Sequence, residues 1–371
     1  MLQLTSTITE NATIEIGLRD IEVPKPGADE VLIEVQASPI NPSDLGTLVG
    51  AGDLTSIRVE GEGDQAKVIM DIPESVMWAM KPRIGKPLPV GNEGSGIVTD
   101  AGENAKHLIG KVVSAVGGGM YAQYRVLPAM ACIEMPDGTE PKDCASSFVN
   151  PLTALGMVET MKSEGHSALI HTAAASNLGQ MLVKICLADN IPLINIVRKP
   201  EQVDLLKSIG AEYVCNSSDN NFKDSLVEAI KATNATLAFD ATGGGELSGR
   251  ILSCMEIALR ANMKEFSPYG STQHKQVYIY GALNQSGISL PNNRSFGMYW
   301  GIGGWLLTPF LENAGMEKNI ELRNRVSSEI KTTFTSSYTK EISLAQALSL
   351  EEMMVYGSIA TGKKYLINPS L

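Results

Sequence analysis

A turn of small residues stands in mid-chain between an apolar run and an amphipathic one. Residues 173–179 read Ala-Ala-Ala-Ser-Asn-Leu-Gly. Dinucleotide-binding turns have the pattern G-x-G-x-x-G, in which the third glycine allows close helix packing and the helix N-terminus binds the pyrophosphate. Gly179 keeps that third position, but Ala174 and Ser176 replace the first two glycines. A turn that serves packing alone has the same pattern. The residues that we expect to contact a dinucleotide are Ala174, Ser176, Asn177, Leu178 and Gly179.

Two basic residues, Arg198 and Lys199, follow the next predicted strand, residues 193–197. They lie about 20 residues beyond Gly179, where an NAD-binding site places an acidic residue on the ribose hydroxyls. A cation at this point instead pairs with the 2′-phosphate of NADP, and an arginine does so through two parallel hydrogen bonds. The sequence therefore favours NADPH, with a solvated charge at a helix start as the alternative.

Further cofactor contacts are expected where other strands end, because ligands of open parallel sheets bind at the carboxyl ends of the strands. Ordinary loop residues are an equally good interpretation of these positions. The residues are Asn216, Thr242, Gly243, Gly281 and Ala282.

The elements that must position these residues alternate between strand and helix. The hydrophobic periods predict strands at 168–172, 193–197, 213–216, 237–241 and 277–283, and helices at 177–189, 201–209, 222–230 and 247–261. Such alternation predicts βαβ units and a parallel, doubly wound sheet.

The chain on either side of this region has a different pattern. Residues 1–145 are rich in Gly, Pro and β-branched residues and predict a largely β domain, with an irregular insertion at about 51–89. We place a cofactor-binding domain at 146–310. The segment 311–371 is helical and polar, ends in a predicted strand at 364–367, and is expected to return to the first domain.

Composition narrows the class of protein. A chain of 371 residues with 43% hydrophobic and 19% charged residues suits two globular domains. The net charge of −11 argues against a nucleic-acid partner. No signal peptide or membrane span is recognisable, and the five scattered cysteines lack a C-x-x-C pair, so we expect free thiols and a cytoplasmic location.

Five motifs in order resemble the medium-chain dehydrogenase/reductase superfamily across nearly the whole chain. The resemblance implies an α/β protein with a GroES-like β domain beside a Rossmann domain, and an active site in the cleft between them. Residues 194–198 look particularly like mitochondrial enoyl-thioester reductases. The motifs are Asn-Pro-Ser-Asp at 41–44, Gly-Asn-Glu-Gly-Ser-Gly at 91–96, Tyr-Ala-Gln-Tyr-Arg-Val at 121–126, Asn-Pro-Leu-Thr-Ala at 150–154, and the turn at 173–179.

The resemblance also predicts that no metal is held. Zinc alcohol dehydrogenases of the superfamily have Cys and His where this chain has Asn41 and Asn92, and neither Asn is a good zinc ligand. Without a Lewis acid, transfer of hydride to an electron-poor quinone or conjugated carbonyl remains feasible. We therefore expect a zinc-independent NADPH:quinone oxidoreductase-like enzyme with a small electrophilic substrate.

By the same resemblance, Asn41 lies near the nicotinamide and is the candidate catalytic residue, donating to a developing oxyanion. Asn150 and Thr153 are expected near the nicotinamide ring or the adjoining phosphate. Asn41 and Asn150 each precede a proline, so capping of a turn is the alternative for both. Enoyl-thioester reductases carry a proton-donating Tyr after the first motif, but residues 50–52 here are Gly-Ala-Gly.

Two rival functions stay open. One is an enoyl-thioester (enoyl-CoA or enoyl-ACP) reductase, for which Lys81, Arg83 and Lys86 could form a basic patch. The other is a non-catalytic NADPH-binding structural or sensor protein. A homodimer is also expected, because the apolar, Gly-rich segment 296–310 resembles the edge strand through which these proteins pair.

Overall fold

The computed structural model of the chain describes residues 1–358 and 363–371. It divides into two compact units. Unit 1 comprises residues 1–149 and 323–371, and unit 2 comprises residues 150–322. The sequence predicted boundaries near 145 and 310. The second observed boundary falls later, inside α9 (Leu307–Ser328), a helix that is interrupted by non-helical backbone at Gly315.

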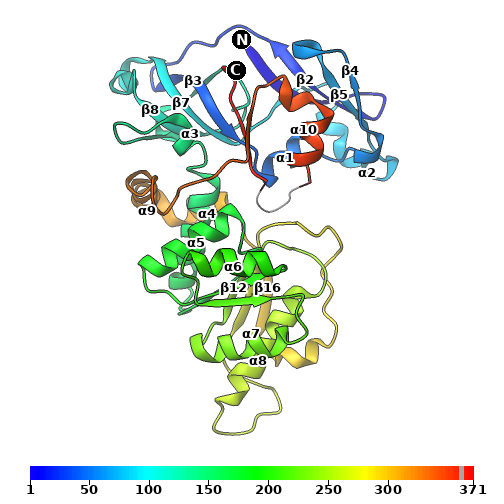
Figure 1. Cartoon of the computed structure of the whole chain (residues 1–371), viewed down its shortest axis with the longest axis vertical. Helices are drawn as coiled ribbons and strands as arrows, with labels where there is room; N and C mark the ends of the chain where they lie inside the picture. The colour runs from blue at the N-terminus through cyan, green and yellow to red at the C-terminus, as the bar shows by residue number, and fades with distance from the viewer. Residues whose placement is uncertain (359–362) are drawn as a thin grey trace. The chain divides into compact units, whose positions relative to one another are not determined.

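The elements are numbered along the chain as in Figure 1. The strands are β1 Leu2–Ile8, β2 Thr13–Asp20, β3 Glu30–Pro39, β4 Arg58–Glu60, β5 Lys67–Asp71, β6 Leu88–Pro89, β7 Glu93–Ala101, β8 Val112–Val116, β9 Tyr124–Pro128, β10 Cys132–Glu134, β11 Leu169–Thr172, β12 Leu193–Val197, β13 Tyr213–Asn216, β14 Leu237–Asp240, β15 Lys275–Ile279, β16 Trp300–Gly304, β17 Lys340–Ile342 and β18 Tyr365–Ile367. The helices are α1 Pro42–Leu48, α2 Glu74–Met80, α3 Pro141–Cys144, α4 Val149–Ser163, α5 Asn177–Ala188, α6 Pro200–Ser208, α7 Phe222–Thr233, α8 Leu247–Ala261, α9, and α10 Leu350–Tyr356.

Unit 2 is built on a six-stranded sheet in the order β13-β12-β11-β14-β15-β16, in which every pair is parallel. Helices α5 and α6 cover one face and α7 and α8 the other (Figure 1). Phe222 of α7 and Ile251 of α8 share one buried cluster with Val277 of β15. The predicted Rossmann-type, doubly wound sheet is confirmed.

One predicted strand had the wrong bounds. The pattern predicted a strand at 277–283, but β15 runs from Lys275 to Ile279. It starts early because Lys275 pairs with the first residue of β16. It ends early because the next residues turn toward β14, where Leu283 N donates to Ala241 O at 3.2 Å. Hydrophobic residues continue into the turn, so periodicity alone could not locate the end.

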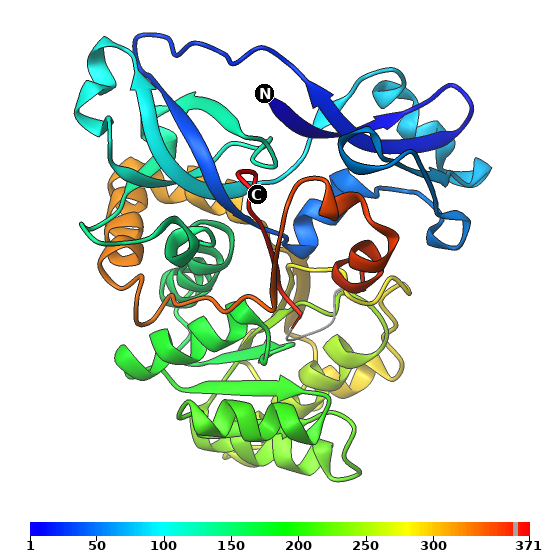
Figure 2. The same ribbon diagram turned by 45° about the horizontal axis from the view of Figure 1, so that its top comes forward.

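Unit 1 is mainly β-structure in two sheets. One has the order β4-β5-β2-β1-β6, and the other β10-β8-β7-β3-β18-β17 with β9 also paired to β3. The expected insertion at about 51–89 therefore carries β4, β5, α2 and β6, and β5 extends the first sheet by pairing with β2. At the end of the chain, β18 pairs antiparallel with β3 (Figure 2).

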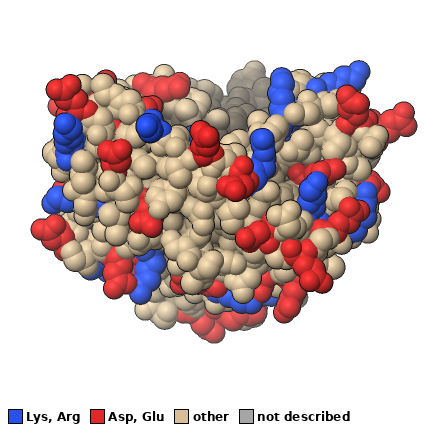
Figure 3. Space-filling model, turned by 90° about the horizontal axis from the view of Figure 1, so that it is seen from above, with Lys and Arg blue, Asp and Glu red and all other residues tan. Residues whose placement is uncertain are grey.

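The surface mixes charges of both signs. On the face shown in Figure 3, acidic and basic side chains are interspersed and the described residues form no continuous basic area. This agrees with the net charge of −11. None of the described helices combines the length and apolar character needed to cross a bilayer.

A buried ion pair joins α8 to the start of β15. Glu256 and Lys275 are both almost completely buried, and Lys275 Nζ lies 2.8 Å from Glu256 Oε2. Ser271 donates to the same carboxylate through its backbone N (2.9 Å) and Oγ (2.6 Å), and Arg260 Nε donates at 2.7 Å. Burial opposes ionisation of Glu256, but these donors outweigh it and hold the pKa of the carboxyl at about 2.

Glu256→Gln should leave the Lys275 ammonium buried without a carboxylate. Removing one partner of a buried pair costs about 3–5 kcal/mol, and the free energy of unfolding in urea should fall by that amount. The control is Glu228→Gln, which breaks an exposed pair with Lys231 (2.8 Å) and should cost less than about 1 kcal/mol. Equal losses for the two variants would contradict a stabilising role for the buried pair.

Candidate functional site

The turn after β11 has the expected conformation although Ala174 and Ser176 replace the first two glycines of the dinucleotide-binding pattern G-x-G-x-x-G. Ser176 is the N-cap of α5, and its Oγ accepts a hydrogen bond from Gly179 N at 3.2 Å. Its side chain is therefore turned onto its own helix. Ala174 is fully buried, and a Cβ at Gly179 would lie 2.1 Å from Ala174 O. Gly179 is thus required for the close approach of helix and strand, which brings the N-terminus of α5 to the carboxyl edge of the sheet.

The two basic residues after β12 lie at the same edge and are exposed. Their backbone is fixed, because Gln202 Oε1 accepts from Arg198 N (3.0 Å) and Lys199 N (3.2 Å), and Ser218 Oγ donates to Arg198 O (2.9 Å). Within residues 1–358 and 363–371, no acidic side chain forms an ion pair with either cation. Both charges are available to an anionic ligand.

Asn216, a predicted cofactor contact, is the last residue of β13. Its Nδ2 donates to Asp219 Oδ1 (2.8 Å) and its Oδ1 accepts from Ser218 N (3.0 Å). The side chain is largely buried and shapes the turn that holds Arg198.

A buried carboxylate fixes the turn after β14. Asp240 Oδ1 accepts from Thr172 Oγ1 (2.7 Å) and from Thr242 N (2.8 Å), and Thr172 Oγ1 in turn accepts from Ala241 N (2.9 Å). These bonds join the carboxyl ends of β11 and β14, so the predicted Thr242 is held rigidly at the sheet edge.

The turns after β14 and β15 also touch each other. A Cβ at Gly243 would lie 2.1 Å from Gly281 O. Because Gly243 also has φ of 68°, the glycine is needed for backbone packing and conformation whatever it binds. The structure thus brings together four predicted contacts, Thr242, Gly243, Gly281 and Ala282.

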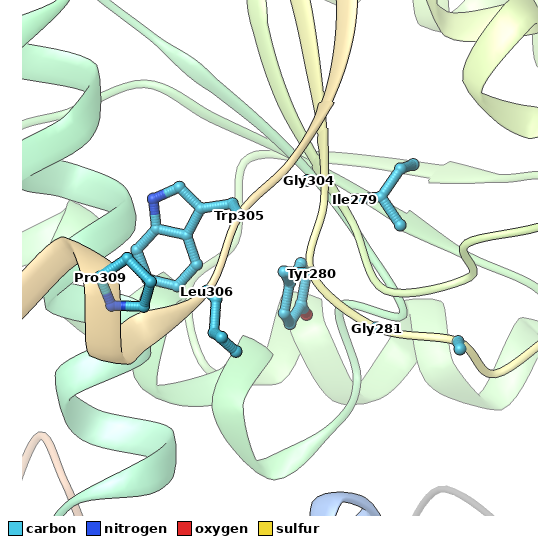
Figure 4. A pocket seen from close by; sticks show the side chains of 8 residues that line it. Ile279, Tyr280, Gly281, Gly304, Trp305, Leu306 and Pro309 are labelled. Atoms are coloured by element: carbon cyan, nitrogen blue, oxygen red, sulfur yellow. The ribbon is translucent and has the colours of Figure 1, made fainter. Parts of the chain in front are cut away.

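A cavity of about 500 Å³ opens beside the last two of these residues, at the carboxyl ends of β15 and β16 (Figure 4). Its walls are mostly apolar or aromatic. They are Ile279, Tyr280, Gly281, Ala282, Gly304, Trp305, Leu306 and Pro309. The sequence predicted Gly281 and Ala282 here but not Trp305, Leu306 or Pro309. The pattern at 296–310 was interpreted as a pairing edge strand or as a buried strand and helix, and neither interpretation places these residues in a ligand cavity.

Hydrogen bonds and ring contacts fix the aromatic walls of the cavity. The Tyr280 hydroxyl lies 2.6 Å from His171 Nε2, and the two rings stack. Burial lowers the pKa of His171 to about 3, so its ring is neutral. Trp305 Nε1 donates to Thr160 Oγ1 (3.1 Å), and its ring meets Phe239 edge-on. The cavity is therefore preformed, and no sequence motif pointed to the role of His171.

Asn41, the candidate catalytic residue, lies in unit 1 as the N-cap of α1. It is 2% exposed. Asn41 N donates to Asp44 Oδ2 (2.7 Å), and Asn41 Nδ2 donates to Glu93 Oε1 (2.8 Å). Asp44 Oδ1 also accepts from Asn92 N (2.7 Å). The Asn41 side chain makes no capping hydrogen bond to α1, and the bond across to Asp44 comes from its backbone N. No sequence motif pointed to the bond between Asn41 and Glu93.

The remaining predicted residues lie on other elements, in α4 of unit 2 and in the β-rich unit 1. Asn150 and Thr153 lie in the first turn of α4, where Thr153 is buried and Asn150 is half-buried. Arg83, proposed for a basic patch, donates to Ser6 Oγ (3.2 Å) and Thr47 O (3.3 Å). Its guanidinium is therefore used within unit 1. Among the described residues, no three His, Cys, Asp or Glu side chains are grouped to hold a metal ion.

The fold and the sheet-edge site define a dinucleotide-binding α/β protein with a separate β-rich unit. Two family models match it: "Alcohol dehydrogenase GroES-like domain" over residues 27–137 and "Zinc-binding dehydrogenase" over residues 178–277. The chain belongs to the medium-chain dehydrogenase/reductase superfamily, as its motifs predicted.

Solved structures agree over the whole chain. A Mesorhizobium loti protein assigned as an NADPH:quinone reductase is 26% identical, with a TM-score of 0.72, and the match covers 100% of this chain and 98% of that one. An Escherichia coli quinone oxidoreductase complexed with NADPH has the same fold at 16% identity, with a TM-score of 0.70 and full coverage of both chains.

Among curated proteins, the mitochondrial enoyl-[acyl-carrier-protein] reductase of Caenorhabditis elegans is 27% identical over 62% of this chain and 60% of its own length. Mouse prostaglandin reductase-3 is 28% identical over 53% of this chain and 45% of its own length. The chain thus spans between 45% and 60% of the length of these two relatives.

Proposed function

We propose that the protein is an NADPH-dependent, zinc-independent oxidoreductase that transfers hydride to a quinone or another α,β-unsaturated carbonyl compound. The observation that carries this proposal is the exposed Arg198, free of ion pairs among the described side chains, at the sheet edge that also holds the N-terminus of α5. The similarity to the M. loti protein supports the same class of reaction.

The residues of unit 2 fit the cofactor by charge and by space. The pyrophosphate would lie at the N-terminus of α5, where Gly179 gives the close approach. Arg198 and Lys199 would pair with the 2′-phosphate. Because the protein has a net charge of −11, binding of an anionic phosphate requires local cations such as these. The open, mostly apolar cavity beside Tyr280 and Trp305 would receive the nicotinamide ring.

The main contribution of the protein to the reaction would be to position the cofactor and the acceptor. When bound, NADPH supplies the hydride, and an electron-poor acceptor needs no Lewis acid to take it. Asn41 would donate its second amide hydrogen to the oxygen on which charge develops. Asn41 and Asn92, in the place of zinc-binding Cys and His, support a zinc-independent reaction. Asn150 and Thr153 would contact the nicotinamide ring or the adjoining phosphate.

We also propose a cytoplasmic location, which is consistent with the five free cysteines.

Arg198→Ala should weaken NADPH binding by about 1.5–3 kcal/mol, the range for a hydrogen bond to a charged group, and leave NADH binding nearly unchanged. Fluorescence titration of both cofactors measures this. Lys207→Ala, which removes an exposed cation from the same helix region, is the matched control and should affect neither cofactor. An equal loss of NADPH and NADH affinity would refute the assignment of Arg198 to the 2′-phosphate.

An enoyl-thioester reductase is the second candidate, favoured by the name of the C. elegans relative. Against it stand the Gly-Ala-Gly at 50–52 in place of a Tyr and the use of Arg83 within unit 1. The exposed Lys81 and Lys86 are left as cations for a phosphate-bearing carrier.

Steady-state assays with NADPH and three acceptors separate the candidates. We expect kcat/KM for 1,4-naphthoquinone or trans-3-penten-2-one to exceed that for crotonyl-CoA at least about tenfold, the equivalent of 1.4 kcal/mol in transition-state binding. The reverse order would establish the thioester reductase. Tight NADPH binding with no turnover of any of the three would indicate a structural or sensor protein.

A homodimer is part of the proposal. Strand β16 (Trp300–Gly304) ends the sheet of unit 2 and pairs only with β15 among the described strands. An unpaired strand edge is a template for a second copy related by two-fold symmetry. Sedimentation equilibrium should give twice the mass of the chain, and a monomer up to 100 µM, on the order of the concentrations at which weak contacts form, would exclude the dimer.

A further inference from the structure

Five buried side-chain atoms among the described residues of unit 1 lack a hydrogen-bond partner, and two of them concern the candidate catalytic residue. The first belongs to Asn41 itself. Its Nδ2 donates to Glu93 Oε1 at 2.8 Å, but its Oδ1 is buried with no hydrogen-bond partner among the described residues. Glu93 cannot turn away, because its Oε2 accepts from the backbone N of Phe148 (2.8 Å) and of Val149 (2.9 Å). The Asn41 amide is therefore held in one orientation, in which Oδ1 has no hydrogen-bond donor among the described residues.

The second atom is the ammonium nitrogen of Lys364, directly ahead of β18. Strand β18 runs antiparallel to the end of β3, and Ile40 N donates to Tyr365 O at 3.0 Å. The strands pair Leu366 with Pro39, so the same register continued past both strand ends brings Lys364 to the level of Asn41. Asp44 and Glu93, which both hydrogen-bond to Asn41, also act electrostatically on Lys364. Figure 2 shows the C-terminal strand beside β3. Lys364 Nζ is buried and has no hydrogen-bond partner among the described residues.

The charged and titratable groups around the ammonium come from several elements. The Glu93 carboxyl faces it from β7 and the Asp44 carboxyl from α1, and the ring of Tyr338 lies 5.9 Å from Nζ. Burial lowers the pKa of Lys364 to about 8, against the opposing effect of the two carboxyls. Burial also raises the pKa of Asp44 to about 7. Lys364 is therefore a cation at neutral pH that releases its proton readily.

Only one kind of group satisfies both orphaned atoms at once. A buried donor or acceptor without a partner costs about 1–3 kcal/mol, so such atoms are normally bonded to protein or to ordered water. Asn41 Oδ1 requires a donor and Lys364 Nζ requires an acceptor. An O–H group provides both, whereas an anion would be repelled by the amide oxygen. Water is the smallest molecule with this property.

We propose that Lys364 is the proton source for the acceptor, acting through a water held between its ammonium and Asn41 Oδ1. The proposal rests on the proposed reductase function, in which Asn41 is directed at the acceptor's oxygen. Lys364 would take the role of the proton-donating Tyr, which this chain lacks because residues 50–52 are Gly-Ala-Gly.

The proton and electron changes balance. When bound, NADPH would supply a hydride to the electron-poor carbon of the acceptor. The π pair of the attacked C=C bond then shifts toward the carbonyl carbon, and the π pair of the C=O bond moves to the oxygen. For an enone, protonation of that oxygen gives an enol, which tautomerises to the saturated ketone in solvent. The water gives a proton to that oxygen and takes one from Lys364. Lys364 is left as a neutral amine and regains a proton from solvent after the product leaves.

The pH dependence of kcat with trans-3-penten-2-one tests this, because only the protonated lysine is active. Wild-type kcat should be level below about pH 8 and fall tenfold per pH unit above it. Lys364→Met should lower kcat roughly 10²–10⁴-fold, the usual contribution of a positioned acid, and abolish that fall. Lys364→Arg should also lower kcat and remove the fall near pH 8, because a guanidinium does not release its proton at these pH values. The exposed neighbour provides the control, and Lys363→Met should match wild type.

A second measurement does not depend on turnover. In protein labelled with ¹³Cε-lysine, the NMR signal that disappears in Lys364→Met should titrate with a midpoint near 8 in the wild type. A midpoint above about 10, near the ordinary lysine value, would overturn the proposal. So would a Lys364→Met enzyme that keeps kcat within threefold or keeps the fall near pH 8.

The proposal and the reductase function fail in distinguishable ways. Lys364→Met should bind NADPH as tightly as wild type, since its contacts lie in unit 1. Loss of turnover with unchanged NADPH affinity supports the proton source. Failure of the wild type to bind NADPH would overturn the reductase function itself, and the proton source with it.

Discussion

Parallel pairing of the six strands in unit 2 brings all their carboxyl ends to one edge, and the candidate cofactor site depends on that geometry. Residues far apart in the chain meet there: the N-terminus of α5, Arg198 after β12, Thr242 after β14 and Gly281 after β15. Asp240 binds the ends of β11 and β14 together, so the edge is rigid before any ligand arrives. A preorganised edge lowers the ordering cost of binding a long, flexible dinucleotide.

The two units use buried lysines in opposite ways. Lys275 is paired with Glu256 and surrounded by further donors to that carboxylate, so its charge is compensated and its role is to hold α8 against β15. Lys364 has carboxyls nearby but no hydrogen bond to either, and its Nζ is left open. Removing one partner of a buried ion pair destabilises a fold, whereas a buried charge without a hydrogen bond is a candidate for a functional position.

The fingerprint turn illustrates how one function can survive the loss of its usual residues. The second glycine normally permits backbone approach to the pyrophosphate. Here Ser176 turns its Oγ onto Gly179 N and caps α5 instead of projecting toward a ligand. The third glycine has no substitute, since any Cβ there would meet Ala174 O. The departure is therefore local, and the strand, turn and helix remain those of the superfamily.

The sequence by itself determined the alternation of strands and helices, because hydrophobic periodicity is a local property of each segment: β12 and α8 have the bounds that the pattern predicted. It also predicted Arg198 and Gly179 as candidate cofactor contacts, because their spacing is set along one βαβ unit. Only the tertiary structure decided the end of β15, the cavity walls at Trp305 and Pro309, and the placement of Lys364 at the level of Asn41. These depend on contacts between distant segments, which periodicity and local motifs do not encode.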